Sequence, residues 1–193
     1  MNRKWFGVVA LAGALTLCAP APTAAQAKKA EAPKPAKHEW VEARESWEEI
    51  GRKLIAIAED LPENKYWTSP VKDARTFGDM LLHVAGVNYQ IVNAIAGKQL
   101  GNGENDPPRA KYNSKAAVVA YLKKSFADGS AHLNGVTSHD AFEKKIVNPW
   151  ANELIHQHSL WGVAVAHASE HYGSLATYYR VSGMVPPESR PRR

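Results

Sequence analysis

The stretch TFGDMLLHVAGVNYQIVNAIAG, residues 76–97, has the features of a complete helix. The hydroxyl of Thr76 can accept a hydrogen bond from a main-chain N–H of the first turn, and Asp79 is a shorter substitute for the usual capping-box glutamate. Apolar residues then recur at helical spacing, and Gly97 is a suitable stop. The apolar stripe consists of Met80, Val84, Val87, Ile91 and Ile95. We therefore predict an amphipathic helix that buries one face.

Three other segments show the same helical spacing of apolar residues, over residues 39–61, 114–133 and 159–183. Gly129 weakens the middle of the second of these segments, because glycine is a poor helix former. No segment shows the alternation of a strand, so the fold class is predicted to be all-α. Four amphipathic helices within residues 38–190 predict one four-helix-bundle domain. Two connections are longer than antiparallel neighbours need, which indicates at least one long crossover connection.

The first 27 residues have the pattern of a secretory signal peptide. A basic start is followed by an apolar run from Trp5 to Leu17 and by small residues that end at Ala27. The run is too short to span a membrane, so we expect cleavage near Ala27 and export to the periplasm or the medium. One alternative is a lipoprotein anchored through Cys18, although Leu17 is bulkier than such sites usually tolerate.

Residues 28–37 are rich in lysine, alanine and proline and are expected to form a disordered linker. The final SRPRR, residues 189–193, is expected to be a solvated terminus. Loss of the signal peptide removes two basic residues and no acidic one, which lowers the net charge from +5 to +3. So mild a charge does not indicate a nucleic-acid partner. The single cysteine lies in the signal peptide, so the mature chain has no thiolate ligand and no disulfide.

A pair of histidines, His167 and His171, is spaced by one helical turn in AHASEHYGSLATYYR, residues 166–180. Residues four apart share a helix face, and we expect this face to be turned toward the bundle interior. The same stripe contains Leu160, Val163, Ala164 and Ser174. The pair alone fits two interpretations equally, hydrogen-bonded core residues or two ligands of a divalent cation. His83, on or beside the inward stripe of residues 76–97, is a third ligand candidate, and three histidines would leave coordination positions open.

The residues 167–171 also match the H-x-x-E-H pattern of inverted zincin proteases. That class needs an acidic ligand well downstream on a far larger fold, and the only acidic residue after His171 is Glu188, so we reject it. Glu170 is then either a second-sphere or base residue or an ordinary solvated glutamate, and Tyr178 is another candidate for proton transfer. His156 and His158 are expected in a surface loop before the last helix, with the mouth of the site as the alternative.

The segments RTFGDMLLHVAGVNY, residues 75–89, and HASEHYGSLATYYRVSGMVPPESR, residues 167–190, resemble the DinB-like (damage-inducible) superfamily. The resemblance extends from about residue 39 to residue 190. It implies a four-helix bundle of up-down-down-up topology and a homodimer. It also implies a divalent metal, commonly nickel or zinc, held by His83, His167 and His171.

The resemblance leaves the reaction open. Some relatives are transferases or isomerases that use low-molecular-weight thiols, but these cosubstrates are chiefly cytoplasmic, which weakens this interpretation for an exported protein. We therefore expect a metal-dependent hydrolase or transferase that acts on a small molecule. The alternative is a non-catalytic metal-binding or stress-associated module, which a fourth protein ligand such as His158 would favour.

Overall fold

The computed structural model describes residues 36–98 and 107–191, so the predicted signal peptide and residues 28–35 of the predicted linker lie outside the described residues. The described chain contains four long helices within two residues of their predicted bounds, which confirms the all-α four-helix bundle. They are α1 (Glu39–Asp60), α2 (Phe77–Ile95), α3 (Lys115–Asn134) and α5 (Gln157–Val181). Among these residues, no helix is long and apolar enough to cross a bilayer.

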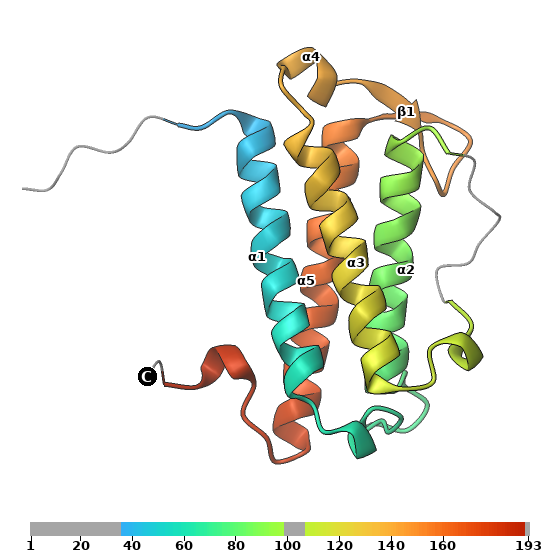
Figure 1. Ribbon diagram of the computed structural model, residues 1–193, viewed down its shortest axis with the longest axis vertical. Helices are drawn as coiled ribbons and strands as arrows, with labels where there is room; N and C mark the ends of the chain where they lie inside the picture. The colour runs from blue at the N-terminus through green and yellow to red at the C-terminus, as the bar shows by residue number, and fades with distance from the viewer. Residues whose placement is uncertain (1–35, 99–106, 192–193) are drawn as a thin grey trace, which may run out of the picture. The chain divides into compact units, whose positions relative to one another are not determined.

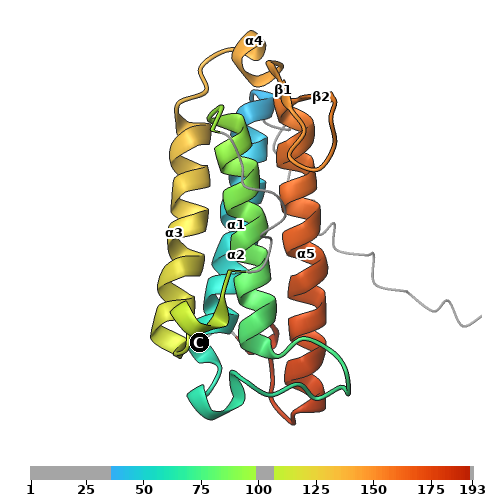
Figure 2. The same ribbon diagram turned by 90° about the vertical axis from the view of Figure 1, so that its right-hand side faces the viewer.

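The helices follow the up-down-down-up order that the family resemblance implies. In Figure 1, α1 runs away from the end that carries the short helix α4 (His139–Phe142), α2 and α3 both run back toward it, and α5 runs away again. Each of α1 and α2 packs against both α3 and α5, as the view in Figure 2 also shows. The parallel neighbours α2 and α3 therefore need the long connection that the sequence indicates.

A small antiparallel hairpin departs from the predicted absence of strands. It pairs β1 (Lys145–Val147) with β2 (Leu154–His156) and places Ile146 opposite Ile155. Strands of three residues are too short for an alternating pattern to stand out in the sequence. The hairpin and α4 cap one end of the bundle, where Ile146 is buried.

Trp47 is one of the largest fully buried side chains of the core. Its indole Nε1 donates a hydrogen bond of 3.0 Å to the main-chain oxygen of Phe126 on α3. A Cβ atom added at Gly129 would lie 2.5 Å from Cζ2 of this indole. Because Gly129 has no side chain, the Trp47 indole fits between α1 and α3. Helix α3 continues through Gly129 without a break.

The segment after α5 is held against α1 by two charged pairs. Arg52 on α1 bonds both carboxylate oxygens of Glu188 at 2.7 Å, and Arg190 bonds both oxygens of Asp60 at 2.7 and 2.6 Å. Arg180 also donates to the Ser189 hydroxyl at 3.1 Å. The prediction of a solvated terminus is therefore wrong for residues 189 and 190, because each has a partner on the bundle.

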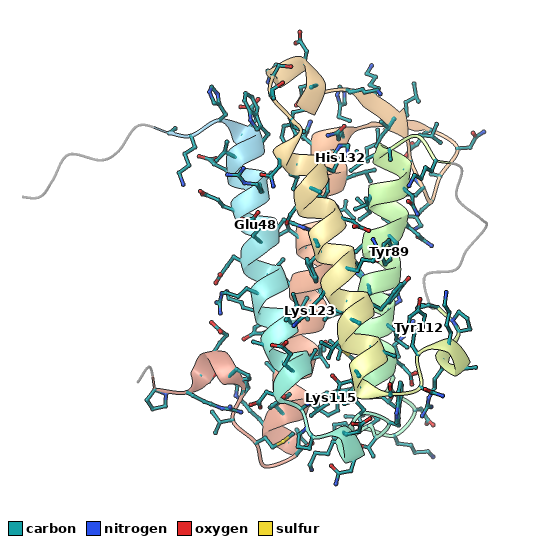
Figure 3. All side chains as sticks on the ribbon, viewed as in Figure 1. Glu48, Tyr89, Tyr112, Lys115, Lys123 and His132 are labelled. Carbon is teal, nitrogen blue, oxygen red and sulfur yellow. The ribbon has the colours of Figure 1, made fainter. Side chains whose placement is uncertain are left out.

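The chain that enters α3 is fixed by aromatic and main-chain contacts. The Tyr121 ring lies between Tyr89 of α2 and Tyr112, with ring centroids 4.9 and 4.4 Å apart, and Figure 3 labels the two outer tyrosines. Lys115, also labelled there, donates from Nζ to the main-chain oxygens of Glu59 and Leu61 at the end of α1. These contacts tie the start of α3 to α1 and α2.

Candidate metal centre

Three histidines from two neighbouring helices meet between α2 and α5. His83 lies two turns into α2, and His167 and His171 follow one another by one turn in α5. The Nε2 atom of His167 is 3.1 Å from Nε2 of His83 and 3.1 Å from Nε2 of His171. The structure thus brings together the three residues that the sequence singles out as ligand candidates.

The arrangement of the three rings suits a cation better than hydrogen bonds alone. The Nε2 atom of a neutral imidazole carries either one proton or one lone pair, so it makes one ordinary hydrogen bond. Nε2 of His167 faces two ring nitrogens at hydrogen-bonding distance. Protons cannot satisfy both contacts well, whereas one cation placed between the rings accepts a lone pair from each.

The nitrogen separations also match metal coordination. Zinc–nitrogen bonds of about 2.0–2.1 Å place two ligand nitrogens about 3.3 Å apart in a tetrahedron and about 2.9 Å apart at right angles. The two separations of 3.1 Å fall between these limits. The donor set therefore fits a divalent ion without large movement of either helix.

Burial favours the uncharged form that a ligand histidine needs. Burial, together with the positive charge that His171, His83 and Arg75 carry or acquire, lowers the pKa of His167 to about 4. The Nδ1 atom of His167 is buried and has no hydrogen-bond partner in the described part of the chain. A neutral ring protonated at Nδ1 would direct its Nε2 lone pair at the other two histidines.

The pair on α5 lies at the margin of the buried face rather than at its centre. Val163, predicted on the inward stripe, is 41 % exposed, which contradicts that placement. Leu160 and Ala164, which were predicted on the same stripe, are fully buried, and so are Ala168 and Leu175. At about 100° per residue, His167 and His171 lie about 60° around the helix from Ala164 and Ala168, which are three positions earlier. Both histidines are half-buried beside α2 and remain reachable from solvent.

The two candidates for proton transfer differ in their surroundings. Glu170 lies on the exposed side of α5, and its carboxylate is not part of the histidine group. Tyr178 is 7 % exposed and packs edge-on against Phe77 with ring centroids 5.3 Å apart. Tyr178 is thus packed as a core residue.

The other histidine pair does not lie in a loop as predicted. His156 ends β2, and His158 is the second residue of α5. Both contact Glu143, a residue that the sequence did not single out, because it is far from them along the chain and lies in no recognisable motif. His167 comes nine positions after His158 in α5, a rise of about 14 Å at 1.5 Å per residue, so His158 does not reach the three-histidine group.

Comparisons with known proteins agree with this fold. A family model described as the DinB superfamily matches residues 46–175. A DinB-like protein from Bacillus cereus is 13 % identical with a TM-score of 0.61, covering 75 % of this chain and 93 % of its own. YfiT from Bacillus subtilis, described as a probable metal-dependent hydrolase with an unusual four-helix bundle topology, is 16 % identical with a TM-score of 0.61, covering 80 % and 94 %. No curated protein matches the chain.

Proposed function

The chain belongs to the DinB superfamily, and we propose that it binds one divalent metal ion through His83, His167 and His171. We further propose that it is a hydrolase or transferase whose reaction depends on that ion. The observation that carries this proposal is the convergence of the three Nε2 atoms, with two separations of 3.1 Å. Imidazole is a good ligand for both zinc and nickel, which are the two ions we favour. The description of YfiT, which shares the fold, supports a hydrolase in particular.

The number of protein ligands favours catalysis over storage. Within residues 36–98 and 107–191, no fourth histidine, cysteine or carboxylate joins the three-histidine group. The fourth ligand that a closed storage site would need, His158, is bonded to Glu143 instead. Three ligands leave positions for water and substrate, as in catalytic metal sites.

The chain supplies the geometry on which the chemistry depends. When bound, a divalent ion lowers the pKa of a water toward neutrality or polarises a substrate oxygen. The two helices hold the imidazoles so that their lone pairs meet at one point, and burial keeps His167 neutral. Half-burial of all three rings at the margin between α2 and α5 leaves an approach for a small-molecule substrate.

Export and dimerisation are further parts of the proposal. Export rests on the sequence of residues 1–27, and the homodimer and the small-molecule substrate rest on the family resemblance. N-terminal sequencing of protein recovered outside the cytoplasm would test cleavage near Ala27. Light scattering of the purified protein would test the dimer, and a monomeric mass would contradict it.

Elemental analysis of purified protein tests the metal centre. We expect His83→Ala to lose the tightly bound ion and to lose any hydrolytic activity found with ester or amide substrates. The loss of activity should exceed the roughly 10–100-fold cost of removing an outer-sphere partner. Purification without chelators, followed by desalting, keeps the tight ion and removes loosely held metal.

His139→Ala is the matched control, because His139 is exposed and pairs with Glu39 away from the candidate centre. It should retain the metal content and activity of the wild type. Wild-type protein without a stoichiometric ion, or His83→Ala protein with a full complement, would show that the assignment is wrong.

A further inference from the structure

A second group of metal-ligating side chains lies at the capped end of the bundle. Glu143 follows α4, His156 ends β2 and His158 lies in the first turn of α5. Each offers one ligand atom, and the three atoms lie within 4.8 Å of one another. This group, the cap cluster, is about 14 Å along α5 from the three-histidine group. One ion therefore cannot serve both groups.

The Glu143 carboxylate lies between the two imidazoles. Its Oε1 is 2.7 Å from Nδ1 of His158, and its Oε2 is 3.3 Å from Nδ1 of His156. Two imidazole nitrogens and one carboxylate oxygen form a donor set that binds zinc in proteins. The three side chains are 32–43 % exposed, so an ion can reach them while water fills its remaining positions.

The partner of His158 on its other side fits ligation through Nδ1. Nε2 of His158 is 3.1 Å from the hydroxyl oxygen of Ser159. A histidine that binds metal through one nitrogen carries its proton on the other, which is usually donated to an oxygen. The Ser159 hydroxyl oxygen is placed to accept a hydrogen bond from that N–H group and so to fix the tautomer.

Ligation by His156 has a cost that sets the expected affinity. Its Nδ1 now donates a hydrogen bond of 2.9 Å to the main-chain oxygen of Glu143. Binding through this nitrogen replaces that hydrogen bond, and the neighbouring Lys144 and Lys145 add positive charge. The cap cluster should therefore bind a cation more weakly than the three-histidine group.

We propose that Glu143, His156 and His158 form a second site for a divalent transition-metal ion such as zinc. The ion would join the end of α4, the end of β2 and the start of α5, which are linked otherwise by the short hairpin. This site goes beyond the proposed function and does not depend on it, because the two donor sets share no residue.

Calorimetric titration of metal-free protein with zinc tests the second site. We expect two equivalents to bind the wild type, with the second more weakly. His158→Ala and Glu143→Gln should each lose the weaker equivalent and keep the tighter one, and His83→Ala should show the reverse. His139→Ala, an exposed histidine paired with Glu39, is the control and should bind two equivalents.

The outcomes separate this proposal from the proposed function. If the wild type binds one equivalent and His83→Ala abolishes it, the second site is wrong and the three-histidine centre stands. If the wild type binds only one equivalent and His158→Ala abolishes it, the three-histidine centre is wrong and the cap cluster stands. Two equivalents in both His158→Ala and Glu143→Gln would overturn the second site. Far-UV circular dichroism confirms that each variant is folded.

Discussion

At Gly129, α3 packs directly against the Trp47 side chain of α1, and this contact gives a prediction at the residue scale. Gly129→Ala places a methyl group 2.5 Å from the buried indole of Trp47, which cannot move away because its Nε1 is bonded to α3. Overpacking of this kind costs about 1–3 kcal/mol. It should outweigh the gain of up to about 1 kcal/mol from alanine in a helix. Urea unfolding should therefore show a less stable protein.

Gly162 in α5 is the matched control for this substitution. A Cβ added there meets no atom within 4 Å, and the residue is exposed. Gly162→Ala should leave stability unchanged or raise it by up to about 1 kcal/mol. If Gly129→Ala behaves like Gly162→Ala, the close packing of Trp47 against α3 is wrong.

Individual site residues were predictable where helical spacing fixes the face on which they lie, as for His83 beside the apolar stripe of α2. His167 and His171 stand out because spacing by four fixes a shared face whatever the rest of the fold does. Glu143 could not be found in this way, since it meets His156 and His158 only through the hairpin, and a three-residue strand leaves no pattern. The sequence indicates Gly129 only as a weak point of a helix, because its packing partner Trp47 lies 82 positions earlier in the sequence.

At the scale of the element, the N-terminal cap of α2 is formed by residues that lie close together in the sequence. The hydroxyl oxygen of Thr76 accepts a hydrogen bond of 3.2 Å from the main-chain N–H of Asp79, as the sequence predicts. The Asp79 carboxylate does not return a bond to the main chain of Thr76 but accepts one from its hydroxyl at 2.5 Å. Aspartate is one methylene shorter than the usual glutamate, so it supports the cap through the side chain.

Removal of this cap should weaken α2 and, with it, the position of His83. We expect Thr76→Ala to lower the free energy of unfolding by about 1 kcal/mol, the usual cost of a lost N-cap hydroxyl. Thr76→Ser keeps the hydroxyl and should stay close to the wild type in urea unfolding. Equal stability of the alanine and serine variants would contradict a capping role for the hydroxyl.

The long helices were predictable because each carries its own apolar stripe and its own stop signals. Gly97 and Gly183, which end α2 and α5, have φ angles of +69° and +74°, a conformation that glycine adopts without strain. Which face of α5 is buried was less predictable. Leu160, Val163 and Ala164 all suit an inward stripe, and only packing against α1 and α2 leaves Val163 exposed.

At the scale of the whole molecule, the order of the helices depends on contacts that join distant parts of the chain. Connection lengths predicted a crossover, but they did not say which helices are neighbours, and that came from the family resemblance. No pattern in the sequence predicts that the segment after α5 packs against α1. Arg190 and Asp60 are 130 residues apart, and each had many other oppositely charged residues with which it could pair.

The pair of Asp60 and Arg190 makes the docking of that segment dependent on pH. The hydrogen bonds from Arg190 hold the pKa of Asp60 below its ordinary value of 3.8 in the folded protein, against a smaller opposite effect of burial. The ionised carboxylate therefore stabilises the fold at pH values above about 4. This contribution is lost as the pH falls through the lower folded pKa, because the native carboxylate then takes up a proton.

Asp60→Asn should accordingly be less stable than the wild type near neutral pH, and the difference should shrink as the pH falls below about 4. Urea unfolding of both proteins over this range measures it. Hydrogen bonds from Arg52 likewise lower the pKa of the Glu188 carboxylate. It is present in both proteins, so its effect cancels in the difference. Arg190→Gln should show the same pH dependence of stability. Combined with Asp60→Asn, it should cause little further loss of stability. If the two losses of stability are additive and independent of pH, the two residues act separately.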